Sequence, residues 1–96
     1  MLTKADILQR RDEIIAVAAR HGASDIRIFG SVARGDGTDL SDLDLIVRLE
    51  PGRSLLDHGG LVMDLRELLG IRVDVIDEEA MRPRFCQHVL KEAIPL

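Results

Sequence analysis

The chain has 96 residues, and its 46% hydrophobic and 31% charged residues are typical of a globular protein and exclude an intrinsically disordered one. This length predicts a single domain over residues 1–96, and the net charge of −4 argues against direct nucleic-acid binding, which needs a basic surface. One cysteine, Cys86, excludes an intramolecular disulfide, and with no signal peptide or membrane-spanning run we expect a cytoplasmic protein.

The first predicted element is a helix over residues 4–20. Thr3 followed by Asp6 is typical of an N-cap with an acidic first turn, and apolar residues then recur at helical spacing. Gly22 ends the helix, because glycine readily adopts the left-handed backbone that terminates helices.

A short strand over residues 25–29 is expected next, and it leads into Gly30 and Ser31. One helical turn over residues 32–34 and a polar loop up to Ser41 follow. Glycine lets the backbone approach a phosphate closely, and the free N–H groups at a helix start attract an anion. This segment therefore predicts a phosphate-binding turn.

The strand expected over residues 42–49 is the most informative element. Its alternation places Leu43, Leu45, Val47 and Leu49 on one face, and Asp42, Asp44, Ile46 and Arg48 on the other. The first face belongs to the core. The second begins with two aspartates that point the same way.

The rest of the chain completes an α/β (α+β) pattern. The expected elements are a loop over residues 50–54, an amphipathic helix ending at Gly70, a strand over residues 71–76, and a helix from about Pro83 that Pro95 closes. We expect a small mixed three-stranded sheet with helices mainly on one face, and the candidate site on the opposite, open face.

Three carboxylates carry the predicted chemistry: Asp42, Asp44 and, on the third strand, Asp74. Bringing three carboxylates together is costly without a cation, and their oxygens suit Mg²⁺. Two such ions can activate an attacking oxygen and stabilise a leaving one in phosphoryl transfer. Arg34 lies one turn after Ser31, where its guanidinium can reach the same phosphates. Together these residues predict a site for a nucleoside triphosphate.

The combined motif resembles the DNA polymerase beta nucleotidyltransferase superfamily, and most closely its minimal nucleotidyltransferase antitoxin branch. The matching segments are GSVARGD over residues 30–36, SDLDL over residues 41–45 and VDV over residues 73–75. The resemblance covers almost the whole chain. A Gly-Ser pair alone would mean little, whereas the three segments in this order are specific.

The resemblance implies a role for each matching residue. Gly30 and Ser31 match the pair that binds the triphosphate, and Arg34 matches a basic position that contacts the phosphates. The match makes Asp42 and Asp44 ligands of both metals. It makes Asp74 the third metal ligand, which helps to deprotonate the attacking hydroxyl. It also implies ATP as substrate with two Mg²⁺ ions.

The resemblance further implies a partner, since members of this branch are understood to silence a HEPN-domain RNase toxin by transferring AMP to its tyrosine hydroxyl. The chain has no Trp, no Tyr and only two Phe to stack a base, and no second lobe for an acceptor, so a protein partner could supply both. Two alternatives stay open, namely neutralisation by binding alone and transfer to a small-molecule hydroxyl. An oligomer is possible.

Structural roles compete for several of these residues. The Asp pair alone could be a solvated sheet face, and Arg34 could be a surface arginine or a partner of Asp36. Asp36 and Asp39 fit loop roles better than ligand roles. The three histidines, His21, His58 and His88, lack metal-ligand spacing, and Cys86 is typical of a buried small apolar group.

Overall fold

The computed structural model describes residues 3–34 and 43–96 of the chain. Its central sheet has the strand order β3-β2-β1-β4. The strands are β1 (Ala23–Phe29), β2 (Leu43–Leu49), β3 (Val73–Asp77) and β4 (Ile94–Pro95). β1 is antiparallel to both of its neighbours, whereas β2 and β3 are parallel. The sheet is mixed, as predicted.

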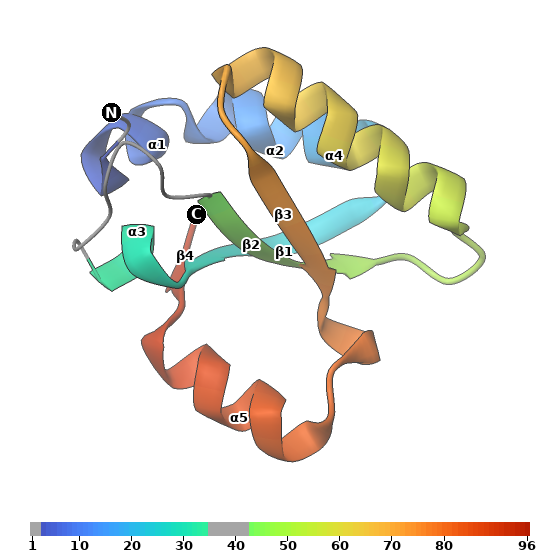
Figure 1. Ribbon diagram of the computed structural model, residues 1–96. Helices are drawn as coiled ribbons and strands as arrows, with labels where there is room; N and C mark the ends of the chain where they lie inside the picture. Colours follow the sequence, from blue (N-terminus) through green and yellow to red (C-terminus); the bar gives the residue numbers. More distant parts are fainter. Residues whose placement is uncertain (1–2, 35–42) are drawn as a thin grey trace.

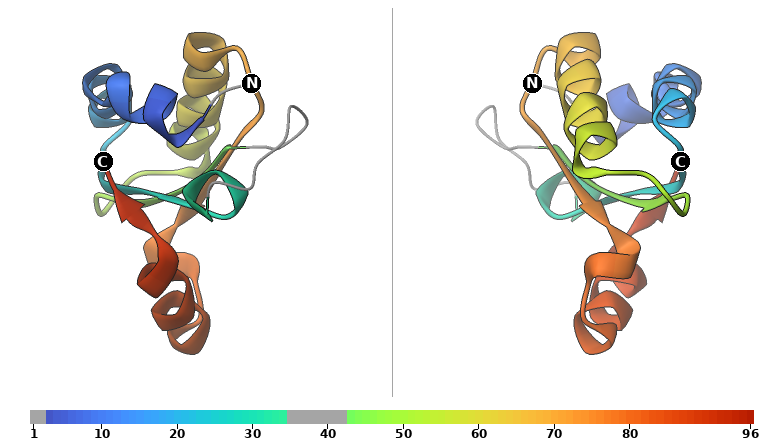
Figure 2. Two further views of the ribbon diagram at one scale, coloured as in Figure 1. Left: turned by 90° about the vertical axis from the view of Figure 1, so that its left-hand side faces the viewer. Right: turned by 90° about the vertical axis from the view of Figure 1, so that its right-hand side faces the viewer.

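The helices lie in two layers. α1 (Lys4–Gln9), α2 (Arg11–Arg20) and α4 (Leu55–Leu69) cover one face of the sheet, while the turn η1 (Glu78–Ala80) and α5 (Pro83–Glu92) lie on the other (Figures 1 and 2). The short helix α3 (Ser31–Arg34) follows β1 directly. Across residues 3–34 and 43–96, no helix has the length and apolar character needed to cross a membrane.

The main core lies between the sheet and the first layer. Leu43, Leu45 and Val47 of β2 are at most 1% exposed, as the alternation predicted. Residues from the helices that complete this cluster include Ile7, Ile14, Leu61 and Leu65. Burial of each such side chain stabilises the fold by about 1.5–3 kcal/mol, so this layer supplies most of the apolar driving force.

The opposite face is partly covered, which corrects the expectation of an open face. Ile46 and Val89 are buried but separate from the main core cluster. Glu78 of η1 lies 3.4 Å from Arg27 Nη1 and 3.1 Å from Arg48 Nη2, and its side chain is only 12% exposed. These ion pairs fix η1 against β1 and β2, and α5 follows it across the sheet.

A fourth strand at the C-terminal end corrects the prediction of three. Ile94 pairs with Ile28, and Pro95 pairs with Arg27 at the outer edge of β1. Pro95 therefore does not close α5, which ends at Glu92. A two-residue strand has no periodicity to detect in sequence, and proline is tolerated at a sheet edge, where its missing N–H faces away from the ladder.

The expected first helix is divided in two at Arg10. There the backbone N–H bonds to the Ile7 carbonyl at 3.0 Å in a tighter turn. The sequence has no proline or glycine at this point to signal the break. The N-cap predicted at Thr3 is present, with a reciprocal capping box to Asp6.

The helix α4 begins at Leu55, before the apolar residues that recur at helical spacing from Leu61 onward. Ser54 caps it, and Asp57 completes a capping box, so that the Ser54 backbone N–H holds the pKa of Asp57 below its usual range. Gly60 lies inside the helix, and a methyl group there would lie 2.9 Å from Cε1 of His21. The glycine weakens the helix but lets His21 pack against it and contact Asp64 at 2.7 Å.

Candidate functional site

Gly30 occupies a position that favours glycine. Its φ is +77°, and a methyl group at its Cα would lie 2.6 Å from Oδ2 of Asp44. The backbone then enters α3, where the Arg34 N–H bonds to the Gly30 carbonyl at 3.1 Å. Because Gly30 has no side chain, the Asp44 carboxylate can occupy the space beside its Cα.

Asp44 belongs to the strand between β1, which leads into Gly30, and β3, which carries Asp74. In the ladder its Cα is paired with Phe29 of β1 on one side and with Asp74 of β3 on the other. Neighbouring strands are about 4.8 Å apart, and paired residues project from the same face. The structure thus brings Gly30, Asp44 and Asp74 together on the face opposite the main core.

The two described carboxylates differ in their surroundings. Asp44 is half-buried beside Gly30. The Asp74 side chain is 50% exposed, and its Oδ1 lies 3.7 Å from Nη2 of Arg66. Oxygen donors of this kind, open on one side to solvent, fit a hard divalent cation. Within residues 3–34 and 43–96, no three His, Cys, Asp or Glu side chains are grouped closely enough to hold a metal.

The remaining predicted site residues are described only in part. Arg34 is exposed at the end of α3, one turn beyond Gly30. Ser31 starts α3, so its backbone lies directly after Gly30. Asp42 lies outside the described residues, as do Asp36 and Asp39.

Two histidines have structural partners. Besides His21 with Asp64, His58 Nε2 lies 2.7 Å from the carbonyl oxygen of Val75. His58 belongs to α4. Cys86 is half-buried on α5 and not fully buried as expected.

Sequence reasoning missed Arg66. This arginine is in the last turn of α4, and its Nε donates to the carbonyl oxygen of Val73 at 3.2 Å while the guanidinium faces Asp74. No sequence signal marks it, because Arg66 and Asp74 are on different elements joined by a turn.

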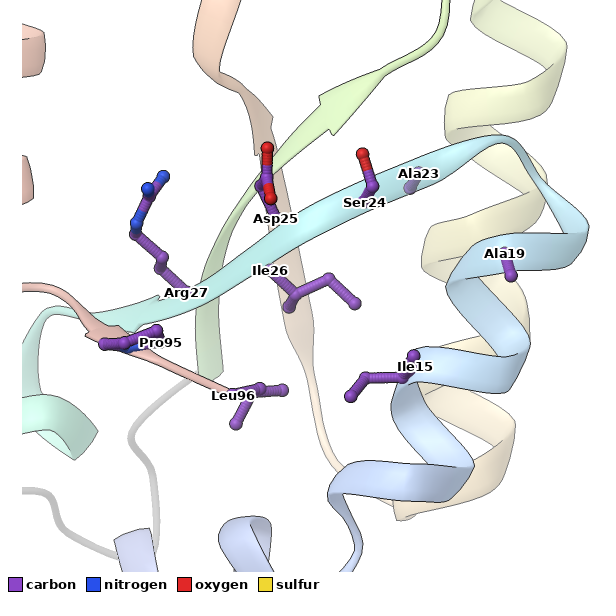
Figure 3. Close-up of a pocket in the computed structure, with 9 residues that line it drawn as sticks. All are labelled: Ile15, Ala19, Ala23, Ser24, Asp25, Ile26, Arg27, Pro95 and Leu96. Carbon is purple, nitrogen blue, oxygen red and sulfur yellow. The ribbon is translucent and has the colours of Figure 1, made fainter.

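Two pockets lie elsewhere on the molecule, and neither is lined by Gly30, Asp44 or Asp74. One, of about 350 Å³, lies between α2, β1 and the C-terminal residues, with Ile15, Ile26 and Leu96 turned toward its interior (Figure 3). The other, of about 530 Å³, is a mainly apolar groove between the start of α4 and the ends of β2 and β3. Asp44 and Asp74 lie instead toward the opposite ends of β2 and β3.

Comparison with known proteins identifies relatives over nearly the whole chain. The nucleotidyltransferase domain family matches residues 11–96. A Methanocaldococcus jannaschii protein, MJ0435, provisionally named a protein adenylyltransferase, is 36% identical over 93% of this chain and 96% of its own length. The protein adenylyltransferase MntA of Thermococcus cleftensis is 36% identical over 78% of this chain and 76% of its own.

Solved structures share the fold. One provisionally named a minimal nucleotidyltransferase superposes with a TM-score of 0.89 at 48% identity, covering 99% of this chain and 97% of the other. A toxin–antitoxin structure with AMP-PNP superposes with a TM-score of 0.75 at 23% identity, over 88% of this chain and 69% of the other. The family match and the shared fold confirm the predicted resemblance. This chain belongs to the nucleotidyltransferase domain family and is a nucleotidyltransferase.

Proposed function

We propose that the chain transfers AMP from ATP to a hydroxyl group of a protein, a tyrosine of a HEPN-domain RNase toxin, and thereby neutralises that toxin as its antitoxin. The observation that carries the proposal is the register of the sheet, which pairs Asp44 with Asp74 directly beside Gly30. This arrangement supports a triphosphate site next to a metal site.

Each residue has a proposed role. The backbone of Gly30 and Ser31, with the Arg34 guanidinium, binds the triphosphate of ATP. Asp42, Asp44 and Asp74 hold two Mg²⁺ ions, which when bound lower the pKa of the acceptor hydroxyl and stabilise charge on the phosphates. The residues Asp44 and Asp74 fit this role because their oxygens lie on one face, with the Asp44 carboxylate in the space beside Gly30.

The transfer itself is a substitution at the α-phosphorus of ATP. The tyrosine oxygen forms a bond to that phosphorus while the bond to the bridging oxygen of the β-phosphate breaks, and pyrophosphate leaves. Asp74 orients the hydroxyl and accepts its proton. Gly30, Ser31 and Arg34 keep the triphosphate in line with the attacking oxygen.

The relatives support a protein acceptor. Two relatives that are 36% identical are named protein adenylyltransferases, one of them provisionally, and proteins of this fold occur in toxin–antitoxin structures, one of them with AMP-PNP. The described part of this chain also offers few aromatic side chains to stack a base, namely Phe29, which is half-buried, and Phe85, which is 51% exposed on α5. A partner would complete the site on the acceptor side.

The decisive experiment is intact-mass spectrometry of the protein encoded beside this chain after incubation with the chain, ATP and Mg²⁺. We expect a mass gain in whole AMP units that requires ATP and is absent with the Asp42→Asn, Asp44→Asn double variant. No mass gain in any candidate partner that co-purifies with the chain would overturn the proposal.

A second candidate is neutralisation by binding without transfer, and exposed apolar side chains favour it. Leu55 and Leu56, at the start of α4, are 86% and 87% exposed, and Leu55 lines the apolar groove. Such side chains are typical of a partner surface. If the Asp44→Asn chain inhibits the toxin fully, and a Leu55→Ser, Leu56→Ser variant does not, binding and not transfer is the active property.

A further inference from the structure

The strand that carries Asp74 is at the edge of the sheet. β3 is the last strand in the order β3-β2-β1-β4, so among residues 3–34 and 43–96 no strand pairs with the other side of its backbone. The Arg72 carbonyl accepts from the Leu43 N–H of β2 at 3.0 Å. Because successive carbonyls of a strand point to opposite sides, those of Val73 and Val75 point outward.

Two side chains of α4 satisfy these outward carbonyls. His58 Nε2 lies 2.7 Å from the Val75 oxygen, and Arg66 Nε lies 3.2 Å from the Val73 oxygen. A carbonyl oxygen can only accept, so His58 donates from Nε2. The two contacts come from one helix and fall on the residues immediately before and after Asp74.

Arg66 makes a further contact, with Asp74 itself. Its Nη2 lies 3.7 Å from Asp74 Oδ1, while Nε holds the neighbouring carbonyl. The planar guanidinium of Arg66 therefore contacts both the backbone and the carboxylate. A lysine, with a single charged nitrogen, cannot make both contacts in this way. The pair of donors fixes where Asp74 lies relative to Asp44.

We propose that His58 and Arg66, which together form a β3 clamp, are positioning residues that hold the Asp74 carboxylate in register with Asp44 for metal binding and transfer. The proposal rests on the role given to Asp74 under the proposed function. An edge strand without such donors moves more freely, and small displacements of a reacting group are costly in rate.

The His58 half of the clamp is tested by Mn²⁺ binding, which needs no acceptor. Free Mn²⁺ is followed by electron paramagnetic resonance in the presence of a non-hydrolysable ATP analogue. We expect His58→Leu to weaken Mn²⁺ binding about tenfold and His58→Gln, which keeps a donor, to restore most of it. His88→Leu, at an exposed position on α5, is the matched control.

The Arg66 half is tested by turnover with the acceptor identified by mass spectrometry. We expect Arg66→Met to lower kcat about tenfold or more, with the KM for ATP changed little, and Arg66→Lys to recover only part of the loss. Arg20→Gln, at the exposed end of α2, is the control for a lost positive charge.

The clamp is overturned if His58→Leu and Arg66→Met lower only the melting temperature, with wild-type Mn²⁺ affinity and kcat well below that temperature. It is also overturned if His58→Gln loses as much Mn²⁺ affinity as His58→Leu, and Arg66→Lys loses as much kcat as Arg66→Met. A wild-type chain that binds Mn²⁺ but modifies no acceptor would contradict the proposed function and leave the His58 result decisive for the clamp.

Discussion

The two faces of the sheet use the same strand for different purposes. On β2, Leu43, Leu45 and Val47 face three helices and are at most 1% exposed. On the other face of the same strand, Asp44 is half-buried and Arg48 is 53% exposed. The apolar face anchors the strand, and the rigid strand then holds a carboxylate on the opposite face. Stability and chemistry should therefore respond separately to substitutions one residue apart.

The largest expected effect is on the chemical face. Asp44→Asn should lower transfer by about a hundredfold to a thousandfold, because it removes a fixed charge from the proposed metal site, while the melting temperature changes little. Single-turnover AMP transfer and thermal unfolding measure the two properties. Glu67→Gln, at an exposed position on α4, controls for the lost charge. Retained transfer would remove Asp44 from the catalytic role.

The opposite behaviour is expected on the core face. Leu45→Ala should lower the free energy of unfolding by about 2–5 kcal/mol, because the side chain is fully buried and leaves a cavity. Transfer per folded molecule should persist below the new midpoint in denaturant. Met63→Ala, at a 66% exposed position, should cost under about 0.5 kcal/mol. Equal losses of activity in Leu45→Ala and Asp44→Asn would show that the faces are not separable.

Gly30 connects stability to chemistry, so its substitution should affect both. Gly30→Ala should cost about 1–2 kcal/mol because of its positive φ. It should also lower transfer about tenfold or more, because its methyl group displaces the Asp44 carboxylate. Gly70→Ala is the matched control, with φ +68° and open space around it, and should lose stability alone. Similar transfer by both variants would contradict the close approach of Gly30 and Asp44.

The smallest expected effect concerns the helix layer on the core face. The Ser54 backbone N–H lowers the pKa of Asp57 below the ordinary value of 3.8. A carboxyl whose folded pKa is depressed stabilises the fold above its unfolded pKa, and this contribution is lost as the pH falls through the folded pKa. Wild type should therefore be more stable than Asp57→Asn at neutral pH, and the two should converge below pH 3.8 in urea titrations. A pH-independent difference would contradict this account.

Local signals predicted the elements near the site well. The alternation in residues 43–49 located Asp44 opposite the core face, and the Thr3 N-cap and Gly70 terminator are where the sequence placed them. Gly30 stood out because a glycine between a strand and a helical turn permits a close approach. The structure identifies the approaching group as the Asp44 carboxylate. The roles of Asp42, Ser31 and Arg34 remain predictions.

The fourth strand and the helical layer over the second face were not predicted, because the contacts that form them join residues distant in sequence. β4 has two residues and exists only because Ile94 and Pro95 meet the free edge of β1. The position of η1 on the second face depends on the ion pairs that Glu78 forms with Arg27 of β1 and Arg48 of β2. Neither contact leaves a periodic pattern in the sequence.

The mixed α/β class, the buried face of β2 and the residue types expected at a nucleotidyltransferase site follow from the local sequence, because hydrophobic period and turn chemistry are local properties. The pairing of Asp74 with Asp44 arises only in the folded chain, since that register depends on how α4 returns the chain to the edge of β2. The contacts of His58 and Arg66 with the backbone on either side of Asp74 also arise only there. Contacts between side chains and the carbonyls of another element follow from packing, which no local pattern encodes.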